Sequence, residues 1–189
     1  MRRLLVTLTL GASLLLTPAL SGTGVAADTA TPARWVHAVC TGGTAWLKAL
    51  DAGVHEVSQK IGAPFDPATS KRALLKFLKT AARSTDRFRK RLLHTGTPNV
   101  TVGEDLADAL TQALADARRA LKTARGDIAE LATTDAAALQ AGVDTARASL
   151  NAELSKVSLA LARVADSTSK KLGRAVKDDA ACHALPSLT

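Results

Sequence analysis

The sequence predicts an all-α fold, an up-down antiparallel bundle of four long helices, with a short fifth C-terminal helix if the chain reverses near residue 166. Three observations predict it. Apolar residues recur in steps of three and four along most of the chain, and strand-like alternation is not seen. Aromatic residues make up only 3% of the 189 residues, so the core has to consist of Leu, Val and Ala. The breaks between the periodic segments are short, which makes neighbouring helices antiparallel.

The first 27 residues have the layout of a secretory signal peptide. Met1-Arg2-Arg3 precedes an apolar run from Leu4 to Leu20, and a small-residue cleavage site fits at Val25-Ala26-Ala27. We therefore divide the chain into a signal peptide (1–27) and one helical-bundle domain (28–189), and expect a secreted or extracytoplasmic protein. A retained membrane anchor is the alternative, but the run lies at the lower edge of the ~17–25 residues needed to span a bilayer.

The rest of the chain contains no apolar run long enough to cross a membrane, so we expect no transmembrane segment in the mature protein. A lipid-modified N-terminus would need a cysteine directly after the apolar run. The first cysteine is Cys40, well beyond that point. We therefore expect a protein that is not lipid-anchored.

The first two long helices are predicted over residues 31–61 and 66–95. Thr31 and Asp66 are capping residues, and each is followed by a proline, which suits the first turn of a helix. A glycine follows each segment and marks its end. Within each segment the apolar positions form one seam, and this seam is expected to face the core.

The third and fourth helices are predicted on either side of a break at residues 133–135. Thr101 and Glu104 have the spacing of a capping box, so the third helix is expected to start there. Its apolar rhythm continues to Leu131. The seam of the fourth helix runs from Leu139 to Val164 and continues less regularly beyond it.

The two cysteines, Cys40 and Cys182, lie near the two ends of the mature domain, and in an oxidising compartment they are expected to form a disulfide. If the fourth helix were straight, the two residues would lie on the order of 37 Å apart at ~1.5 Å per residue. A disulfide tolerates a Cα separation of only ~4.4–6.8 Å. The polar segment 166–169 is the best place for a reversal, which would send a fifth helix at about 170–181 back toward Cys40. A straight fourth helix would contradict the disulfide.

The positive charge of the protein is concentrated in one predicted helix. The chain carries +8, or +6 without Arg2 and Arg3, and residues 66–94 alone carry +7, so the remainder of the mature chain sums to −1. Six of these cations recur in steps of three and four on the side opposite the apolar seam. We call this set the basic stripe: Arg72, Lys76, Lys79, Arg83, Arg87 and Lys90.

The basic stripe is either an anion-binding surface or a solvated helix face. Solvated faces usually mix both signs of charge, as the third helix does with Asp116, Arg118, Arg119 and Lys122, whereas the stripe is nearly unmixed. Outside a cell its partners would be an anionic wall polymer, lipid headgroups or an acidic protein. Nucleic acid is an unlikely partner because no aromatic side chains interleave the cations.

Trp35 and Trp46 lie eleven residues apart and therefore on nearly the same face of the first helix, beside several small residues. This face either packs against two neighbouring helices or acts as an association face anchored by the tryptophans. The oligomeric state is left open by the sequence.

The sequence shows no catalytic, metal-binding or cofactor-binding motif. The four histidines lack the three- or four-residue spacing of a helical metal site, and no nucleophile motif or phosphate-binding glycine loop is seen. We therefore expect a secreted, non-enzymatic helical bundle that contacts an anionic envelope component or an acidic partner through its basic helix. The alternatives are a structural or self-associating protein that uses the Trp35/Trp46 face, and an unrecognised all-helical secreted enzyme.

Overall fold

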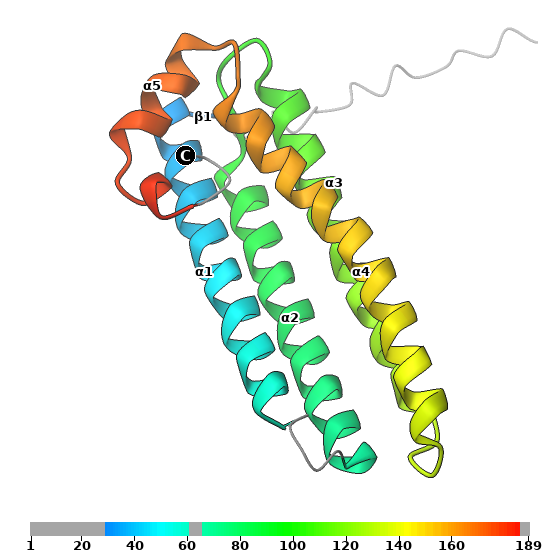
Figure 1. Ribbon diagram of the computed structural model, residues 1–189. Coiled ribbons are helices and arrows are strands. Elements are labelled where there is room, and N and C mark those ends of the chain that lie inside the picture. Colours follow the sequence, from blue (N-terminus) through cyan, green and yellow to red (C-terminus); the bar gives the residue numbers. More distant parts are fainter. Residues whose placement is uncertain (1–28, 61–65, 186–189) are drawn as a thin grey trace, which may run out of the picture.

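The computed structural model describes residues 29–60 and 66–185. The predicted signal peptide (1–27) therefore lies outside the described residues. The described residues form an all-α bundle, which confirms the predicted fold class (Figure 1). In chain order the elements are β1 (Thr29–Ala30), α1 (Pro32–Lys60), α2 (Pro67–Thr95), β2 (Thr97–Pro98), α3 (Gly103–Glu130), α4 (Ala136–Ala165), α5 (Lys170–Asp178) and the 3₁₀ turn η1 (Cys182–Ala184).

Most helices begin at residues whose side chains accept hydrogen bonds from the first turn. The carboxylate of Asp66 accepts from the backbone N–H groups of Ala68 and Thr69, and that of Asp135 accepts from Ala138. Ser169 caps α5 in the same way. These groups satisfy donors that a helix leaves unpaired at its N-terminus, so the local sequence sets where these helices begin.

The start of α3 differs from the prediction, because Thr101 and Glu104 do not form a capping box. The helix begins at Gly103 and no side-chain hydrogen bond caps it. Instead the backbone turns tightly before it, with the N–H of Gly103 donating to the carbonyl of Val100. A Cβ atom on Gly103 would lie 1.9 Å from the carbonyl oxygen of Pro98, so only glycine fits this turn.

The tight turn follows from a short parallel pairing of β1 with β2. Thr29 pairs with Thr97 and Ala30 pairs with Pro98, and the N–H of Asn99 donates to the carbonyl of Ala30 at 2.9 Å. The pairing holds the connection between α2 and α3 against the segment that precedes α1. Strands of two residues are too short to leave an alternating pattern in the sequence.

The four long helices pack in chain order, α1 on α2, α2 on α3 and α3 on α4, but α1 and α4 are hardly in contact. At one end of the bundle α5 packs against both α1 and α4 (Figure 1). We call this the closed end. At the other end, the open end, α1 and α4 are separated and α2 lies between them in the view of Figure 1.

The core consists of two clusters, one at each end. The closed-end cluster is the larger and contains Trp35, Val39, Phe88, Leu161 and Leu172 among its buried residues. The open-end cluster contains Leu78, Leu121, Ile128 and Ala146 with smaller buried side chains, and several of the residues packed against it are only partly buried.

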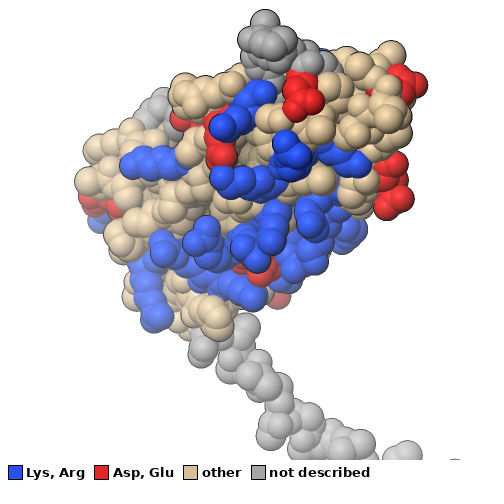
Figure 2. Space-filling view, turned by 90° about the horizontal axis from the view of Figure 1, so that it is seen from below, with Lys and Arg blue, Asp and Glu red and all other residues tan. Residues whose placement is uncertain are grey.

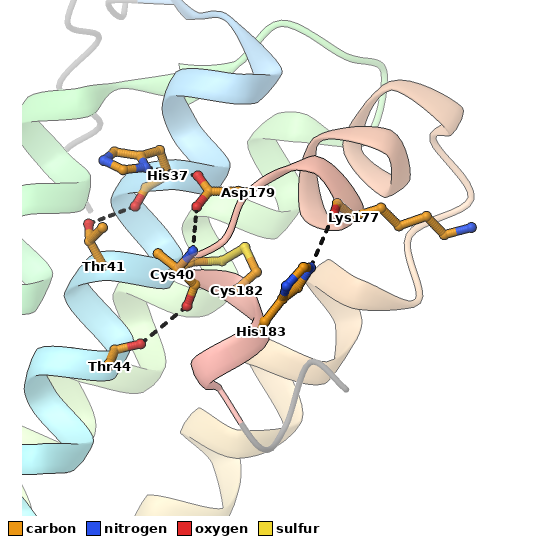
Figure 3. The surroundings of a disulfide bond; sticks show 9 residues. His37, Cys40, Thr41, Thr44, Lys177, Asp179, Cys182 and His183 are labelled. Carbon is orange, nitrogen blue, oxygen red and sulfur yellow. Dashed lines mark hydrogen bonds and ion pairs between the residues drawn. A yellow bond between two sulfur atoms is a disulfide. The ribbon is translucent and has the colours of Figure 1, made fainter.

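The predicted disulfide is present between Cys40 and Cys182, whose Cα atoms are 4.8 Å apart. The chain reverses between the end of α4 at Ala165 and the start of α5 at Lys170, as the length argument requires. Around the bond, His37 Nδ1 lies 2.8 Å from Asp179 Oδ2, and Thr44 donates to the carbonyl of Ala181 (Figure 3). No helix among the described residues is both long and apolar enough to cross a membrane.

Candidate anion-binding surface

The structure divides the basic stripe among three surroundings. Lys79 and Arg83 line a hollow between α2 and α3, and Arg87 lines a second hollow between α1 and α2. The other members have partners: Lys76 lies 2.6 Å from Glu56 of α1, Lys90 lies 3.2 Å from Asp86, and Arg72 donates to the hydroxyl of Thr69. Lys76, Lys90 and Arg72 of the basic stripe thus have partners within the protein, whereas Lys79, Arg83 and Arg87 line the two hollows.

The hollow between α2 and α3 has a volume of about 180 Å³, and its lining carries five cations and one carboxylate. We call it the basic groove, and its residues are Lys79, Ala82, Arg83, Asp86, Arg118, Lys122 and Arg125. Seen along the bundle from its open end, Lys and Arg side chains gather densely along one side of the molecule, where few carboxylates lie (Figure 2). The fold thus concentrates charge of one sign in a concave surface.

Three cations of the basic groove come from α3 and were not among the predicted site residues. Arg118, Lys122 and Arg125 recur in steps of four and three, so they lie on one face of α3. The mixed charges of α3 therefore separate by face: Arg118, Lys122 and Arg125 line the basic groove, whereas Arg119 pairs with Asp116 at 3.1 Å outside this lining. A helical projection of α3 would have separated the groove cations from the Arg119–Asp116 pair. Only the packing of the helices, however, places the groove cations beside α2.

Asp86 pairs with one cation of the groove, Arg118, and with Lys90, which lies outside the lining. Its Oδ1 lies 3.1 Å from Arg118 Nε and its Oδ2 lies 3.2 Å from Lys90 Nζ. Partial burial works against ionisation of this carboxyl, but the hydrogen bond from Lys90 and the charges of Arg118, Lys90 and Arg89 outweigh it, so the pKa of Asp86 lies below its usual value. Asp86 is therefore ionised and neutralises part of the local charge.

The remaining four cations of the groove are Lys79, Arg83, Lys122 and Arg125, two from each helix. All four are exposed, and none forms an ion pair with a carboxylate in the described part of the chain. An exposed cation without an internal partner is free to pair with an external anion. This group of four is the strongest feature of the candidate site.

The second hollow, between α1 and α2, extends the positive surface across α2. It has a volume of about 270 Å³ and is flanked by Arg87 and Arg91. Gly42 and Phe88 both line it, and a Cβ atom on Gly42 would lie 2.5 Å from the ring of Phe88, so the ring packs directly against the backbone of α1. Arg91 donates to the hydroxyl of Thr41 at 2.9 Å, which fixes its side chain at the rim.

The proposed association face of Trp35 and Trp46 is not available to a partner. The exposed fractions are 0% for Trp35 and 3% for Trp46. The indole N–H of Trp46 donates to the hydroxyl of Thr85 at 2.9 Å, which in turn donates to the carbonyl of Ala81. Both tryptophans are therefore core residues between α1 and its neighbours, as the alternative interpretation held, because burying such large rings stabilises the fold most.

The described residues contain no group of three or more His, Cys, Asp or Glu side chains placed to hold a metal ion. The histidines are instead dispersed: His37 pairs with Asp179, His55 contacts Gln59, and His183 lies 3.2 Å from the carbonyl of Lys177.

Searches of protein-family models, of curated proteins and of solved structures found no match to this chain.

Proposed function

We propose that this is a secreted, non-enzymatic protein that binds an anionic component of the cell envelope through the basic groove between α2 and α3. The observation that carries the proposal is the convergence of Lys79, Arg83, Lys122 and Arg125, four exposed cations that pair with no carboxylate of residues 29–60 and 66–185. Export is supported by the layout of residues 1–27, and the disulfide is compatible with an oxidising compartment.

The spacing of the cations favours an anion that repeats along a chain. Lys79 and Arg83 are one helical turn apart, and Arg118 to Arg125 spans about 10 Å at ~1.5 Å per residue. A single exposed ion pair contributes only about 0.2–1 kcal/mol, so useful affinity needs several pairs at once. A polymer or lipid surface that bears phosphate or carboxylate groups supplies them, and the two arginines can hold such groups with two hydrogen bonds each.

The lining of the basic groove also weighs against nucleic acid. Ala82 is the only uncharged residue among the described residues that line it, and these residues offer no ring on which a base could stack. Binding to this lining depends on charge, so it should weaken as salt screens the cations, with a Debye length of about 8 Å at physiological ionic strength.

The proposal is tested with a fourfold variant, Lys79→Gln, Arg83→Gln, Lys122→Gln and Arg125→Gln, assayed for binding to isolated envelope and to phosphatidylglycerol vesicles over a salt series. Four lost ion pairs of about 0.5 kcal/mol each predict roughly thirtyfold weaker binding. Helicity should be unchanged, because Gln is nearly as good a helix former as Lys or Arg.

The matched control removes the same charge from scattered exposed positions, Lys48, Arg163, Lys171 and Arg174, each changed to Gln. Arg118 and Lys122 are unsuitable as controls because they line the groove itself. The control should weaken binding by no more than about threefold, through net charge alone. If the two variants lose affinity equally, the basic groove has no special role and the proposal is wrong.

A further inference from the structure

The open end of the bundle contains a third hollow, of about 310 Å³, between α1 and α4. We call it the open-end groove. Ten of the thirteen described residues that line it are apolar, and they come from all four long helices: Val54, Val57, Leu74, Phe77, Leu78, Ile128, Val143, Ala146, Leu150 and Leu154. The three polar residues are Ser58, Arg147 and Asn151.

The groove exists because α5 spaces α1 from α4 at one end only. At the closed end, α5 fills the space between these helices with its buried residues Leu172 and Val176. At the open end no described segment takes its place. The floor there is supplied by α2 and α3, and the ring of Phe77 lies against the backbone of α1 at Gly53, where a Cβ atom would approach it to 2.4 Å.

The groove leaves apolar surface in contact with water. Val54 is 52% exposed, and Phe77, Val143, Leu150 and several other lining residues are only half-buried. Apolar surface in water is unfavourable, so a concave patch of this kind is a place where an apolar ligand gains affinity. A volume of about 300–1,000 Å³ with few polar groups is typical of small-molecule sites.

The polar groups at the rim of the groove indicate which head group a bound ligand would have. Among the described residues of the lining, Arg147 is the only one with a charged side chain, and this side chain is 72% exposed. It pairs with Asp144 at 3.0 Å, a surface contact that competes weakly with a ligand. Asn151, one turn further along α4, offers a second hydrogen-bonding group beside it.

We propose that the open-end groove binds a single-chain amphiphile with an anionic head group, such as a long-chain fatty acid, with the acyl chain along the apolar floor and the head group at Arg147. A second protein would instead have to cover the outer faces of both helices, which bear exposed polar residues such as Asp51 and His55. A narrow chain reaches the apolar floor without burying them. This site is separate from the basic groove and does not depend on the function proposed for it.

The test is a titration of the secreted protein with octanoate, decanoate, dodecanoate and dodecan-1-ol below their aggregation limits, followed by calorimetry. Each added methylene should tighten binding by roughly fourfold until the groove is full. Arg147→Gln should weaken dodecanoate binding by about threefold or more and leave dodecan-1-ol binding unchanged, because only the anionic head group uses the guanidinium.

A matched pair of substitutions locates the site. Val54→Asp places a charge in the groove at a residue that is 52% exposed, and Leu159→Asp places one on α4 at a residue that is 56% exposed and lines none of the cavities described here. Both variants should fold, because neither side chain is buried. Val54→Asp should weaken dodecanoate binding at least about tenfold, and Leu159→Asp should leave it within about twofold.

Three outcomes would overturn the proposal: no saturable binding of dodecanoate, equal loss in both aspartate variants, or a dimer in light scattering that Val54→Asp dissociates, which would make the groove an interface between copies. The fourfold Gln variant of the basic groove should bind dodecanoate normally. That measurement separates failure of this proposal from failure of the proposed envelope binding.

Discussion

The closed and open ends of the bundle are held together in different ways. At the closed end the stabilising contacts join residues far apart in the chain: the Cys40–Cys182 disulfide, the pairing of β1 with β2, and the His37–Asp179 contact. At the open end the described contacts that order the helix termini are mostly local caps, such as those of Asp66 and Asp135.

One contact at the open end is not a local cap and joins two helices. The ammonium group of Lys71 donates to the carbonyls of Ala129 and Leu131, at 2.7 and 2.6 Å, and so joins the start of α2 to the end of α3. No comparable contact joins α1 to α4 among the described residues. At the closed end α5 contacts both α1 and α4, whereas at the open end no described segment lies between these helices and the open-end groove remains.

The largest effect is expected from removing the covalent tie of the closed end. Changing both Cys40 and Cys182 to Ala should lower the free energy of unfolding by about 2–5 kcal/mol, because the bond closes a long loop and restricts the unfolded chain. Urea unfolding followed by circular dichroism measures the loss. Two alkylatable thiols in the native, unmodified protein, or a mass that does not rise by two protons on reduction, would contradict the bond itself.

A second comparison uses two leucines of the same helix, one at each end. Leu161 is 1% exposed in the closed-end core, whereas Leu150 is half-buried beside the open-end groove. Leu161→Ala should lower stability by about 2–5 kcal/mol, and Leu150→Ala by roughly half as much or less, because its side chain already contacts water. Equal losses in denaturant unfolding would show that the open end is packed as tightly as the closed end.

The smallest effect concerns a cap of the open end and its dependence on pH. Hydrogen bonds from the side chain and backbone of Thr69 hold the pKa of Asp66 below its usual value of about 3.9. A carboxyl whose pKa is lowered by folding stabilises the protein above the unfolded pKa, and this contribution is lost as the pH falls through the folded pKa. Asp66→Ala should therefore be less stable than the unmodified protein at neutral pH.

The stability difference between the Asp66→Ala variant and the unmodified protein should shrink below pH ~4. Melting temperatures measured from pH 7 to pH 2 follow this change. Asp135→Ala removes a neighbouring cap and serves as the comparison at neutral pH. A difference that stayed constant down to pH 2 would mean that the carboxylate of Asp66 contributes nothing to the cap.

Much of the helical architecture could be predicted from the sequence because its signals are local. Asp66 and Asp135 mark helix starts through bonds to their own first turns, and the three- and four-residue rhythm assigns buried positions such as Leu110 and Leu161. The reversal after Ala165 was predictable for a different reason. The disulfide imposes a length condition that a straight helix cannot meet.

The start of α3 and the composition of the site could not be predicted in the same way. Gly103 begins the helix because Pro98, held by β1, occupies the space in front of it, and Thr29 and Thr97 pair across a separation that no local pattern reports. The basic stripe of α2 was visible, but its members proved to have unequal partners, since Lys76 is paired and Lys79 is free.

The sequence alone therefore determined where chain segments are helical, which faces are apolar and that α2 is basic, because these properties depend on residues within a few turns of one another. Only the tertiary structure decided that Arg118, Lys122 and Arg125 of α3 join α2 in one groove, that both tryptophans are buried, and that α1 and α4 stay apart at the open end. Each of these depends on how helices pack, and packing is set by the sum of contacts over the whole chain rather than by any one segment.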